Sequence, residues 1–297
     1  MSPVAPRVVT RRAHAKINVF LRVLGRRDDG FHDIETLVLP ISLHDVVTAE
    51  VAEPGHASVQ VDGDGALTKR LPGSVEDNLA GRAIVAVAER ARPAEGARVV
   101  LDKRIPVAAG LGGGSADAAA TVLALRELWR CDLDAETMAA IAVGLGSDVP
   151  ALLADEPVLA AGRGERLTPV HSATTWWVLR PLGLEVSAAD AYRWWDETPT
   201  TGPDAGVLIA ALETGDVELL GTAVFNDLQP AVASRHPEIG SAIDSFLEAG
   251  ALGAFMCGSG PTVAALARHI GHADSLAAAV PGSIVVSGPP ARPRETG

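Results

Sequence analysis

Short apolar and β-branched segments recur through the first hundred residues and predict a region made mainly of strands. They cover residues 8–10, 17–23, 34–40, 46–51, 57–61 and 98–103. Residues 25–30, with the sequence GRRDDG, have turn composition and are expected to join two of these strands. An apolar repeat of helical period over 79–91 predicts a helix, for which Asp77 or Asn78 offers an N-cap.

Helical patterns alternate with short strand patterns through the rest of the chain. We expect helices over 115–129, 135–143, 188–196, 207–213, 239–249 and 272–279, and strands over 176–180, 254–256, 262–267 and 283–287. Residues 149–154 fit a short helix or a strand. Gly162 to Glu165 mark a turn where the composition changes. The pattern predicts an α+β protein with two domains, residues 1–165 and 166–297.

Composition and charge narrow the classes of partner. The chain has 297 residues, 47% of them apolar, and a formal net charge of −12, which disfavours nucleic acid and anionic membrane surfaces as main partners. Only Cys131 and Cys257 carry thiols, so a reducing, cytoplasmic location is expected. No stretch has the length and apolarity of a transmembrane helix. No His, Cys or Asp cluster has the ligand spacing of a transition-metal site.

Four glycines precede the helix expected from Ser115, namely Gly110, Gly112, Gly113 and Gly114. Glycine allows positive φ and close approach of the backbone to a ligand, and a helix N-terminus attracts anions. The run therefore fits a phosphate site, with a flexible turn as the open alternative. It lacks the Lys-Ser/Thr pair of a Walker A loop and the spacing of the dinucleotide fingerprint.

Three motifs in order resemble those of the GHMP kinases and together span most of the chain. The central one consists of Pro106, Val107, Ala108, Ala109, Gly110, Leu111, Gly112, Gly113, Gly114, Ser115 and Ala116. The first is Ala15-Lys16-Ile17-Asn18, and the third runs from Met256 to Val263. The resemblance implies an N-terminal ribosomal-S5-domain-2-like domain that binds ATP and a C-terminal ferredoxin-like α/β sandwich domain. It also implies ATP with Mg²⁺ as cofactor, with no dedicated metal ligands assigned.

Further segments resemble one branch of this family, whose small-molecule substrate is a cytidine diphosphate methylerythritol. They are residues 25–32, 35–36, 76–79, 103–106, 146–150 and 226–228. The branch transfers the γ-phosphoryl group of ATP to the C2 hydroxyl of the methylerythritol unit. Another GHMP kinase of the homoserine or mevalonate type is the alternative, and a non-catalytic ligand-binding protein on the same fold is a third. A monomer or weak homodimer is expected.

The resemblance assigns catalytic roles to Lys16 and Asp148. A carboxylate can accept the proton of an attacking alcohol, and a nearby lysine keeps that carboxylate ionised and steadies phosphoryl charge. From the residues alone, Asp148 before Val149-Pro150 also fits a helix cap or a turn. Lys16 also fits a solvated surface position. The branch usually has proline where this chain has His14.

The remaining roles follow from the same resemblance. The central motif, Asn78 and Lys103 are expected at ATP, whereas Asp77 is interpreted as a cap. The acceptor site is expected to contain Asn18, Phe31, His32, Tyr192, Gly258, Ser259 and Gly260. Phe31 replaces the tyrosine common in the branch and keeps a face for stacking on cytosine. Tyr192 fits either a second stacking residue or core packing with Trp194 and Trp195.

Overall fold

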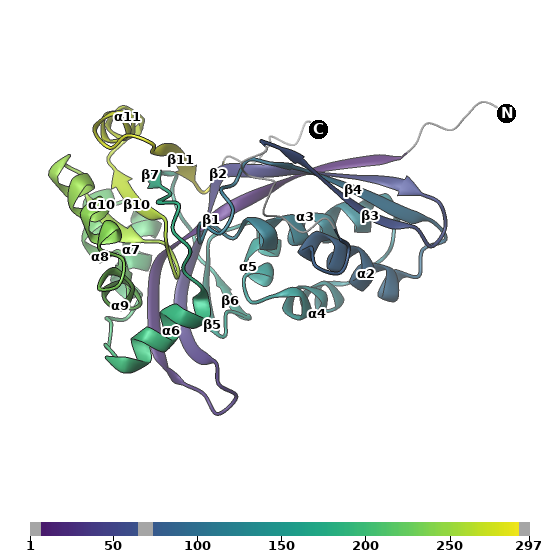
Figure 1. The fold of residues 1–297 in the computed structure, drawn as a ribbon, viewed down its shortest axis with the longest axis horizontal. Helices are drawn as coiled ribbons and strands as arrows, with labels where there is room; N and C mark the ends of the chain where they lie inside the picture. The colour runs from purple at the N-terminus through teal and green to yellow at the C-terminus, as the bar shows by residue number, and fades with distance from the viewer. Residues whose placement is uncertain (1–6, 65–73, 291–297) are drawn as a thin grey trace. The chain divides into compact units, whose positions relative to one another are not determined.

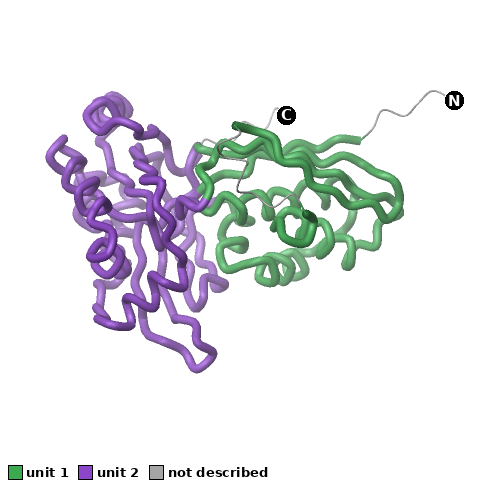
Figure 2. The backbone as a smooth tube through the Cα atoms, in the orientation of Figure 1, with its two compact units in different colours: residues 1–15, 43–107, 112–155 green, residues 16–42, 108–111, 156–297 purple. Residues whose placement is uncertain are grey.

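The computed structural model describes residues 7–64 and 74–290. The chain folds into two compact units, coloured separately in Figure 2. Unit 1 contains residues 7–15, 43–64, 74–107 and 112–155, and unit 2 contains residues 16–42, 108–111 and 156–290. Unit 2 thus takes in residues from both sides of position 165, and the domain boundary near that position stays a prediction.

Two long strands, β1 (Val8–Arg26) and β2 (His32–Ala52), begin the fold (Figure 1). The sequence pattern predicted each as two separate pieces, and this was wrong. The polar run at 11–16 suggested a break in β1, but Ala13 and Ala15 within it are buried at alternate positions, as in a strand. The turn at 25–30 is confirmed: Gly30 has φ +85° and the Arg27 N–H donates to the Phe31 carbonyl at 2.8 Å.

In unit 1, β2 pairs antiparallel with β4 (Gly96–Lys103), and β4 pairs parallel with β3 (Ala57–Gly63). The described helices of this unit are α2 (Leu79–Ala91), α3 (Gly113–Leu128), α4 (Ala135–Leu145) and α5 (Val149–Ala154). The alternative left open for 149–154 is therefore resolved as a helix. Half of the buried residues of α3 are alanines, which lets α2 pack closely against it.

In unit 2, an antiparallel sheet has the strand order β11-β7-β10-β9, built from β7 (Thr175–Arg180), β9 (Gly253–Met256), β10 (Val263–Ala267) and β11 (Ile284–Gly288). Its longer helices lie where the sequence predicted them: α6 (Ala188–Glu197), α7 (Gly206–Thr214), α10 (Pro237–Glu248) and α11 (Ile270–Ala279). The sequence pattern did not predict β5 (Val158–Gly162), β6 (Arg166–Pro169), α8 (Val217–Ala223), β8 (Phe225–Asn226) or α9 (Gln229–Ala233). Each of these has at most seven residues, so its pattern of apolar positions repeats too few times to stand out.

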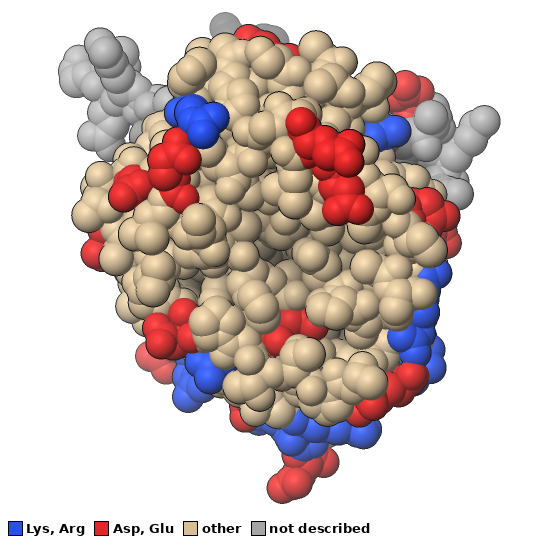
Figure 3. Space-filling model, turned by 90° about the vertical axis from the view of Figure 1, so that its left-hand side faces the viewer, with Lys and Arg blue, Asp and Glu red and all other residues tan. Residues whose placement is uncertain are grey.

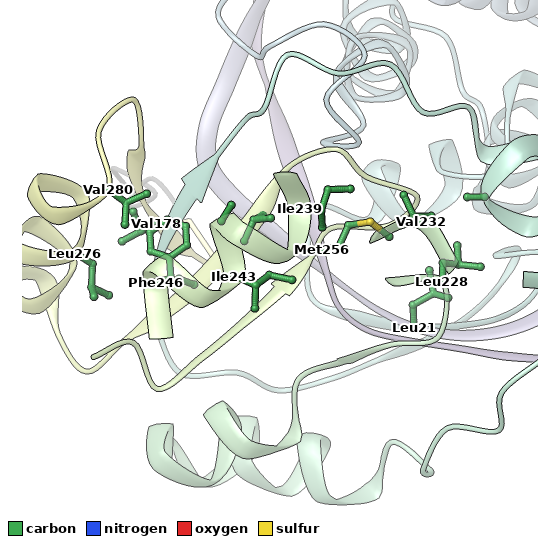
Figure 4. Packing of buried hydrophobic residues seen from close by; sticks show 14 of the residues in the cluster. Leu21, Val178, Leu228, Val232, Ile239, Ile243, Phe246, Met256, Leu276 and Val280 are labelled. Carbon is green, nitrogen blue, oxygen red and sulfur yellow. The ribbon is translucent and has the colours of Figure 1, made fainter. Parts of the chain in front are cut away.

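The core of unit 2 forms where α10 covers the sheet. Ile239, Ile243 and Phe246 lie on one face of α10 and are buried with Val178 of β7 and Met256 of β9 (Figure 4). Burial of one such side chain contributes about 1.5–3 kcal/mol. This packing gives the segment after β9, which holds the third glycine motif, a rigid support.

The face of the molecule drawn in Figure 3 carries both acidic and basic side chains, scattered in small groups among uncharged surface. Across the residues that the structure describes, no helix combines the length and apolarity needed to cross a membrane.

Candidate functional site

Lys16 and Asn18 form a buried polar pair on β1. Their relative exposures are 4% and 5%, and the Lys16 Nζ atom donates to the Asn18 Oδ1 atom at 2.7 Å. The amide of Asn18 donates to the hydroxyl of Thr36 at 2.9 Å, and that hydroxyl donates to the Phe20 carbonyl at 2.7 Å. An ammonium group held this far inside a protein is not the solvated surface lysine of the alternative interpretation.

The same pair is joined to the central glycine motif. The Lys16 Nζ atom donates to the Gly110 carbonyl at 3.1 Å, and the Lys16 backbone N–H donates to the Leu111 carbonyl at 3.0 Å. A Cβ atom placed on Gly258 would lie 3.0 Å from Asn18 Oδ1 and 3.5 Å from Lys16 Nζ. The structure thus brings the first motif together with part of the second and part of the third.

The third motif forms a tight turn at 257–260 that requires glycine. Gly258 and Gly260 have φ of +53° and +90°, with Ser259 between them. Asn226 holds this turn, because its amide donates to the carbonyls of Met256 at 2.6 Å and Gly258 at 2.7 Å. Gly110 packs directly on the turn, since a Cβ atom there would lie 2.5 Å from the Gly260 carbonyl oxygen.

The central motif leads into α3 as expected, although the helix begins two residues before Ser115, at Gly113. Gly112 is the N-cap residue with φ +72° and offers no capping side chain. The N–H groups in the first turn of a helix have no partner within the helix, and they carry a partial positive charge. The start of α3 is therefore suited to an anion, and the Ser115 hydroxyl lies in this first turn.

Asp148 occupies the N-cap position of α5 and is half-buried. Its side chain makes no capping hydrogen bond, and its backbone is in the right-handed helical region at φ −85° and ψ −17°. Asp148 therefore stands where a helix cap would stand, but its carboxylate does not cap the helix. Its role as base stays a prediction.

Aromatic side chains surround His32 at the start of β2. The rings of His32 and Tyr192 stack with centroids 4.8 Å apart and an angle of 20°. His32 Nε2 lies 2.8 Å from Asp196 Oδ1, and the rings of His32 and Trp195 form a T-shaped pair with centroids 5.8 Å apart. Tyr192 is half-buried and packs at the margin of the core. Its surroundings therefore fit core packing in part, and stacking on cytosine stays a prediction.

Phe31 is 49% exposed, which is high for a large apolar side chain. The guanidinium carbon of Arg163 lies 3.6 Å from the centre of the Phe31 ring, within the range of a cation–π contact. Arg163 lies in the turn between β5 and β6, whose flanking Gly162 and Gly164 have φ of +74° and +110°. Phe31 thus offers an accessible ring beside a positive charge.

Two residues expected at ATP have structural partners. Asn78 is the N-cap of α2, where its side chain accepts from the Ala80 N–H at 3.0 Å, whereas Asp77 hydrogen-bonds to Ser74. Of the two residues that could cap α2, Asp77 was therefore the wrong one. Lys103 is 3% exposed, and its ammonium group is bound to Asp45 and Asp117. The ATP contacts expected of Asn78 and Lys103 stay predictions.

Sequence reasoning missed four residues that organise these sites: Asn226, Arg163, Asp45 and Asp117. Asn226 falls in a segment that resembled the family branch, but no role was assigned to it. Asp117 is a charged residue among alanines in α3, and this contrast was a usable signal. Arg163 lies in the predicted turn from Gly162 to Glu165, but no role was assigned to it, and Asp45 has no distinctive local pattern. Within the part of the chain that the structure describes, no group of three or more His, Cys, Asp or Glu could hold a metal ion.

Comparison with known proteins identifies relatives along most of the chain. Residues 78–156 match the GHMP kinases N terminal domain, and residues 208–284 match the GHMP kinases C terminal domain. A protein of Symbiobacterium thermophilum named 4-diphosphocytidyl-2-C-methyl-D-erythritol kinase is 42% identical over 253 residues, which cover 84% of this chain and 87% of that protein. A Thermobifida fusca protein of the same name is 39% identical over 93% of this chain and 92% of its own length.

Solved structures agree with this assignment. A crystal structure of 4-(cytidine 5'-diphospho)-2C-methyl-D-erythritol kinase matches with a TM-score of 0.79 and 33% identity, covering 94% of this chain and 99% of that one. A homoserine kinase from Cytophaga hutchinsonii matches with a TM-score of 0.73 and 22% identity over 97% of this chain and 96% of its own, which shows a shared fold only. The expected two-domain α+β fold is confirmed, and the chain belongs to the GHMP kinases and, within them, to the 4-diphosphocytidyl-2-C-methyl-D-erythritol kinase family.

Proposed function

We propose that this protein transfers the γ-phosphoryl group of ATP to the C2 hydroxyl of 4-diphosphocytidyl-2-C-methyl-D-erythritol. The products are the 2-phosphate and ADP, and the reaction belongs to the non-mevalonate route to isoprenoid precursors. The observation that carries the proposal is the identity of 42% to a kinase of this name over 84% of the chain. The buried Lys16–Asn18 pair, bonded to the Gly110 carbonyl of the central glycine motif, supports it.

In this mechanism Asp148 is the general base. Its carboxylate accepts the proton of the C2 hydroxyl as the oxygen forms a bond to the γ-phosphorus atom. The bond between that phosphorus and the oxygen bridging it to the β-phosphate breaks, and ADP leaves with the electron pair. Lys16 supplies positive charge where charge develops on the transferring group.

The central glycine motif binds the phosphates through backbone N–H groups at the start of α3. Mg²⁺ prefers oxygen ligands and is commonly held by substrate phosphates, waters and one or two protein oxygens. The Ser115 hydroxyl, which lies in the first turn of α3, fits a protein oxygen ligand for an ion that arrives with the phosphates of ATP. When bound, the ion neutralises charge on the phosphates.

The acceptor's cytosine would be recognised by the residues around His32. Phe31 provides the exposed ring on which a base can stack, and base–aromatic stacking contributes about 1–3 kcal/mol. Asp196 and Tyr192 hold the imidazole of His32 in one orientation through a 2.8 Å contact and a stacked ring. Asn18 and the turn at 258–260 would bind the polar part of the acceptor. The enzyme would act in the cytoplasm as a monomer or weak homodimer.

The decisive experiment is a substrate panel with the purified full-length protein, ATP and Mg²⁺. ADP release is measured by a coupled assay, and ³¹P NMR identifies the phosphorylated product. We expect phosphorylation of the cytidyl substrate, with homoserine and mevalonate inactive. Turnover of homoserine or mevalonate without turnover of the cytidyl substrate would refute the proposed acceptor. Binding of ATP and the cytidyl substrate without ADP release would instead support a non-catalytic binding protein.

A further inference from the structure

Three buried charged residues of unit 1 take no part in the proposed mechanism. Lys103 ends β4, Asp45 lies in β2, and Asp117 lies in the second turn of α3. Their relative exposures are 3%, 0% and 3%. Lys103 Nζ donates to Asp45 Oδ2 and, at 2.5 Å, to Asp117 Oδ2. Charged side chains are rarely buried this completely without a specific reason, because desolvation is costly.

The three residues connect both ends of the central glycine motif. On the entry side, the second carboxylate oxygen of Asp45 accepts from the backbone N–H groups of Arg104 at 2.5 Å and Ile105 at 2.8 Å, just before Pro106. On the exit side, Asp117 follows Ala116 directly. A Cβ atom on Gly113 would lie 3.1 Å from the Ile105 side chain and 3.6 Å from Lys103 Nζ, so the helix start packs on the entry segment.

The charges of this group do not balance when all three residues are ionised. One lysine faces two carboxylates, and Asp117 Oδ1 is buried without a hydrogen-bond partner among the described residues. Burial, together with the charge of Asp45, raises the pKa of Asp117 to about 7, against the opposing effect of Lys103. A group optimised for stability alone would contain one carboxylate or an apolar side chain at position 117.

We propose that Asp45, Lys103 and Asp117 are positioning residues that fix the two ends of the central glycine motif for ATP. The inference rests on the proposed ATP-dependent function and assigns Lys103 a role through the motif's backbone. Asp45 orients the entry segment, and Lys103 transmits this orientation to the start of α3 through Asp117. With one proton on the group its net charge is zero, and loss of that proton leaves a negative charge near the expected phosphate site.

The ionisable groups facing Asp117 are those of the same network. They are Lys103 from β4 and Asp45 from β2. Among the residues that the structure describes, the neighbouring helices α2, α4 and α5 contribute no others, because their buried residues are all apolar or glycine. A change of ATP affinity with pH that disappears when Asp117 is replaced can therefore be attributed to the network of Asp45, Lys103 and Asp117.

The test measures binding of a non-hydrolysable ATP analogue with Mg²⁺ by calorimetry, without the acceptor, between pH 6 and 8.5. We expect wild-type affinity to fall about fivefold over this range as negative charge appears near the phosphates, and Asp117→Asn to be flat. We expect Asp45→Ala to weaken the analogue at least tenfold while the KM of the acceptor stays within twofold. Asp102→Ala is the matched control, because Asp102 lies on the same strand as Lys103 but is 45% exposed and pairs with Arg104.

Two results would overturn the inference. One is an Asp117→Asn variant whose affinity follows the wild-type pH profile, and the other is a folded Asp45→Ala variant that binds the analogue as Asp102→Ala does. Circular dichroism establishes folding, and should Asp45→Ala unfold, the near-isosteric Asp117→Asn variant decides the question by its pH profile. A wrong acceptor assignment leaves these binding results unchanged, whereas a wild-type protein that fails to bind the analogue overturns both proposals.

Discussion

Substitution of Gly110 by alanine tests whether the central and third glycine motifs must touch. The added Cβ would lie 2.5 Å from the Gly260 carbonyl oxygen and 3.1 Å from the Cys257 carbonyl oxygen, whereas ordinary contact begins at 3.4 Å. The residue also has φ +76°, which costs alanine about 1–2 kcal/mol. Overpacking adds about 1–3 kcal/mol. We therefore expect Gly110→Ala to lose about 2–5 kcal/mol of unfolding free energy.

Gly183 supplies the matched control, because alanine there meets the backbone strain of a positive φ without any clash of the added Cβ. It has φ +68°, and nothing lies within 4 Å of a Cβ placed there. Gly183→Ala should therefore lose only the backbone term of about 1–2 kcal/mol. Thermal unfolding gives the comparison, at roughly 2–4 °C per kcal/mol for a chain of this size. Displacement of the glycine motif by about 1 Å should also lower kcat/KM by about 100-fold in Gly110→Ala alone.

Two alanine variants that unfold at the same temperature and keep similar kcat/KM would contradict this prediction. That outcome would mean that the two glycine motifs separate at little cost and that their contact has no part in catalysis. A variant that is destabilised but keeps normal kcat/KM would assign the contact to stability alone.

The other predictions concern single side chains. Asp148→Ala should lower kcat by about 10²–10⁴-fold with unchanged affinity for an ATP analogue, and near-normal turnover would refute its assignment as base. Phe31→Ala should raise the KM of the acceptor by about tenfold or more and change kcat little, because stacking on a remote base is uniform binding; an unchanged KM in steady-state assays would argue against this cytosine site. Arg163→Ala should raise the same KM severalfold, since Arg163 lies 3.6 Å from the Phe31 ring, and an equal rise in the KM of ATP would contradict that localised role. The folded-state pKa of Asp117, about 7, exceeds the ordinary 3.8, so its protonation contributes stability that is present at pH 4 and is lost as pH rises through 7. Urea unfolding of the wild type relative to Asp117→Asn should show a loss of up to about 4 kcal/mol between pH 4 and 8, and a difference that stays constant would contradict the raised pKa.

Local patterns were enough to predict the longer elements of the fold. The bounds of the helix over 79–91 were predicted to the residue, because its apolar period is a local signal, although Asp77 and not Asn78 was interpreted as its cap. Short elements such as β8 could not be predicted, since two residues carry no period. The continuity of β1 depends on Ala13 and Ala15 facing a core built from distant residues, and sequence alone does not show which small residues are covered.

The site was predictable where a motif carries the chemistry. Lys16, Asn18 and Gly110 come from two motifs, and the structure joins them by hydrogen bonds. The residues that hold these motifs in place were not predictable. Asn226, for example, binds the turn at 257–260 because the fold brings it there, and no repeating pattern in the sequence indicates this role. Lys103 shows the same limit: its two carboxylate partners lie 58 and 14 residues away, so the local sequence does not show that its ammonium group is buried between them.

The interleaving of the two units along the sequence has a consequence for synthesis on the ribosome. Residues 16–42 belong to unit 2 but emerge long before most of it. Val23 of β1, for example, donates its backbone N–H to Asp227, 204 positions later. Native contacts so distant in sequence form slowly, and unpaired strand edges exposed meanwhile favour aggregation. The edge of β1 that pairs with β8 (Phe225–Asn226) must therefore remain unpaired until those residues are made, so a fragment ending near residue 165 contains the segments of unit 1 but exposes this strand edge.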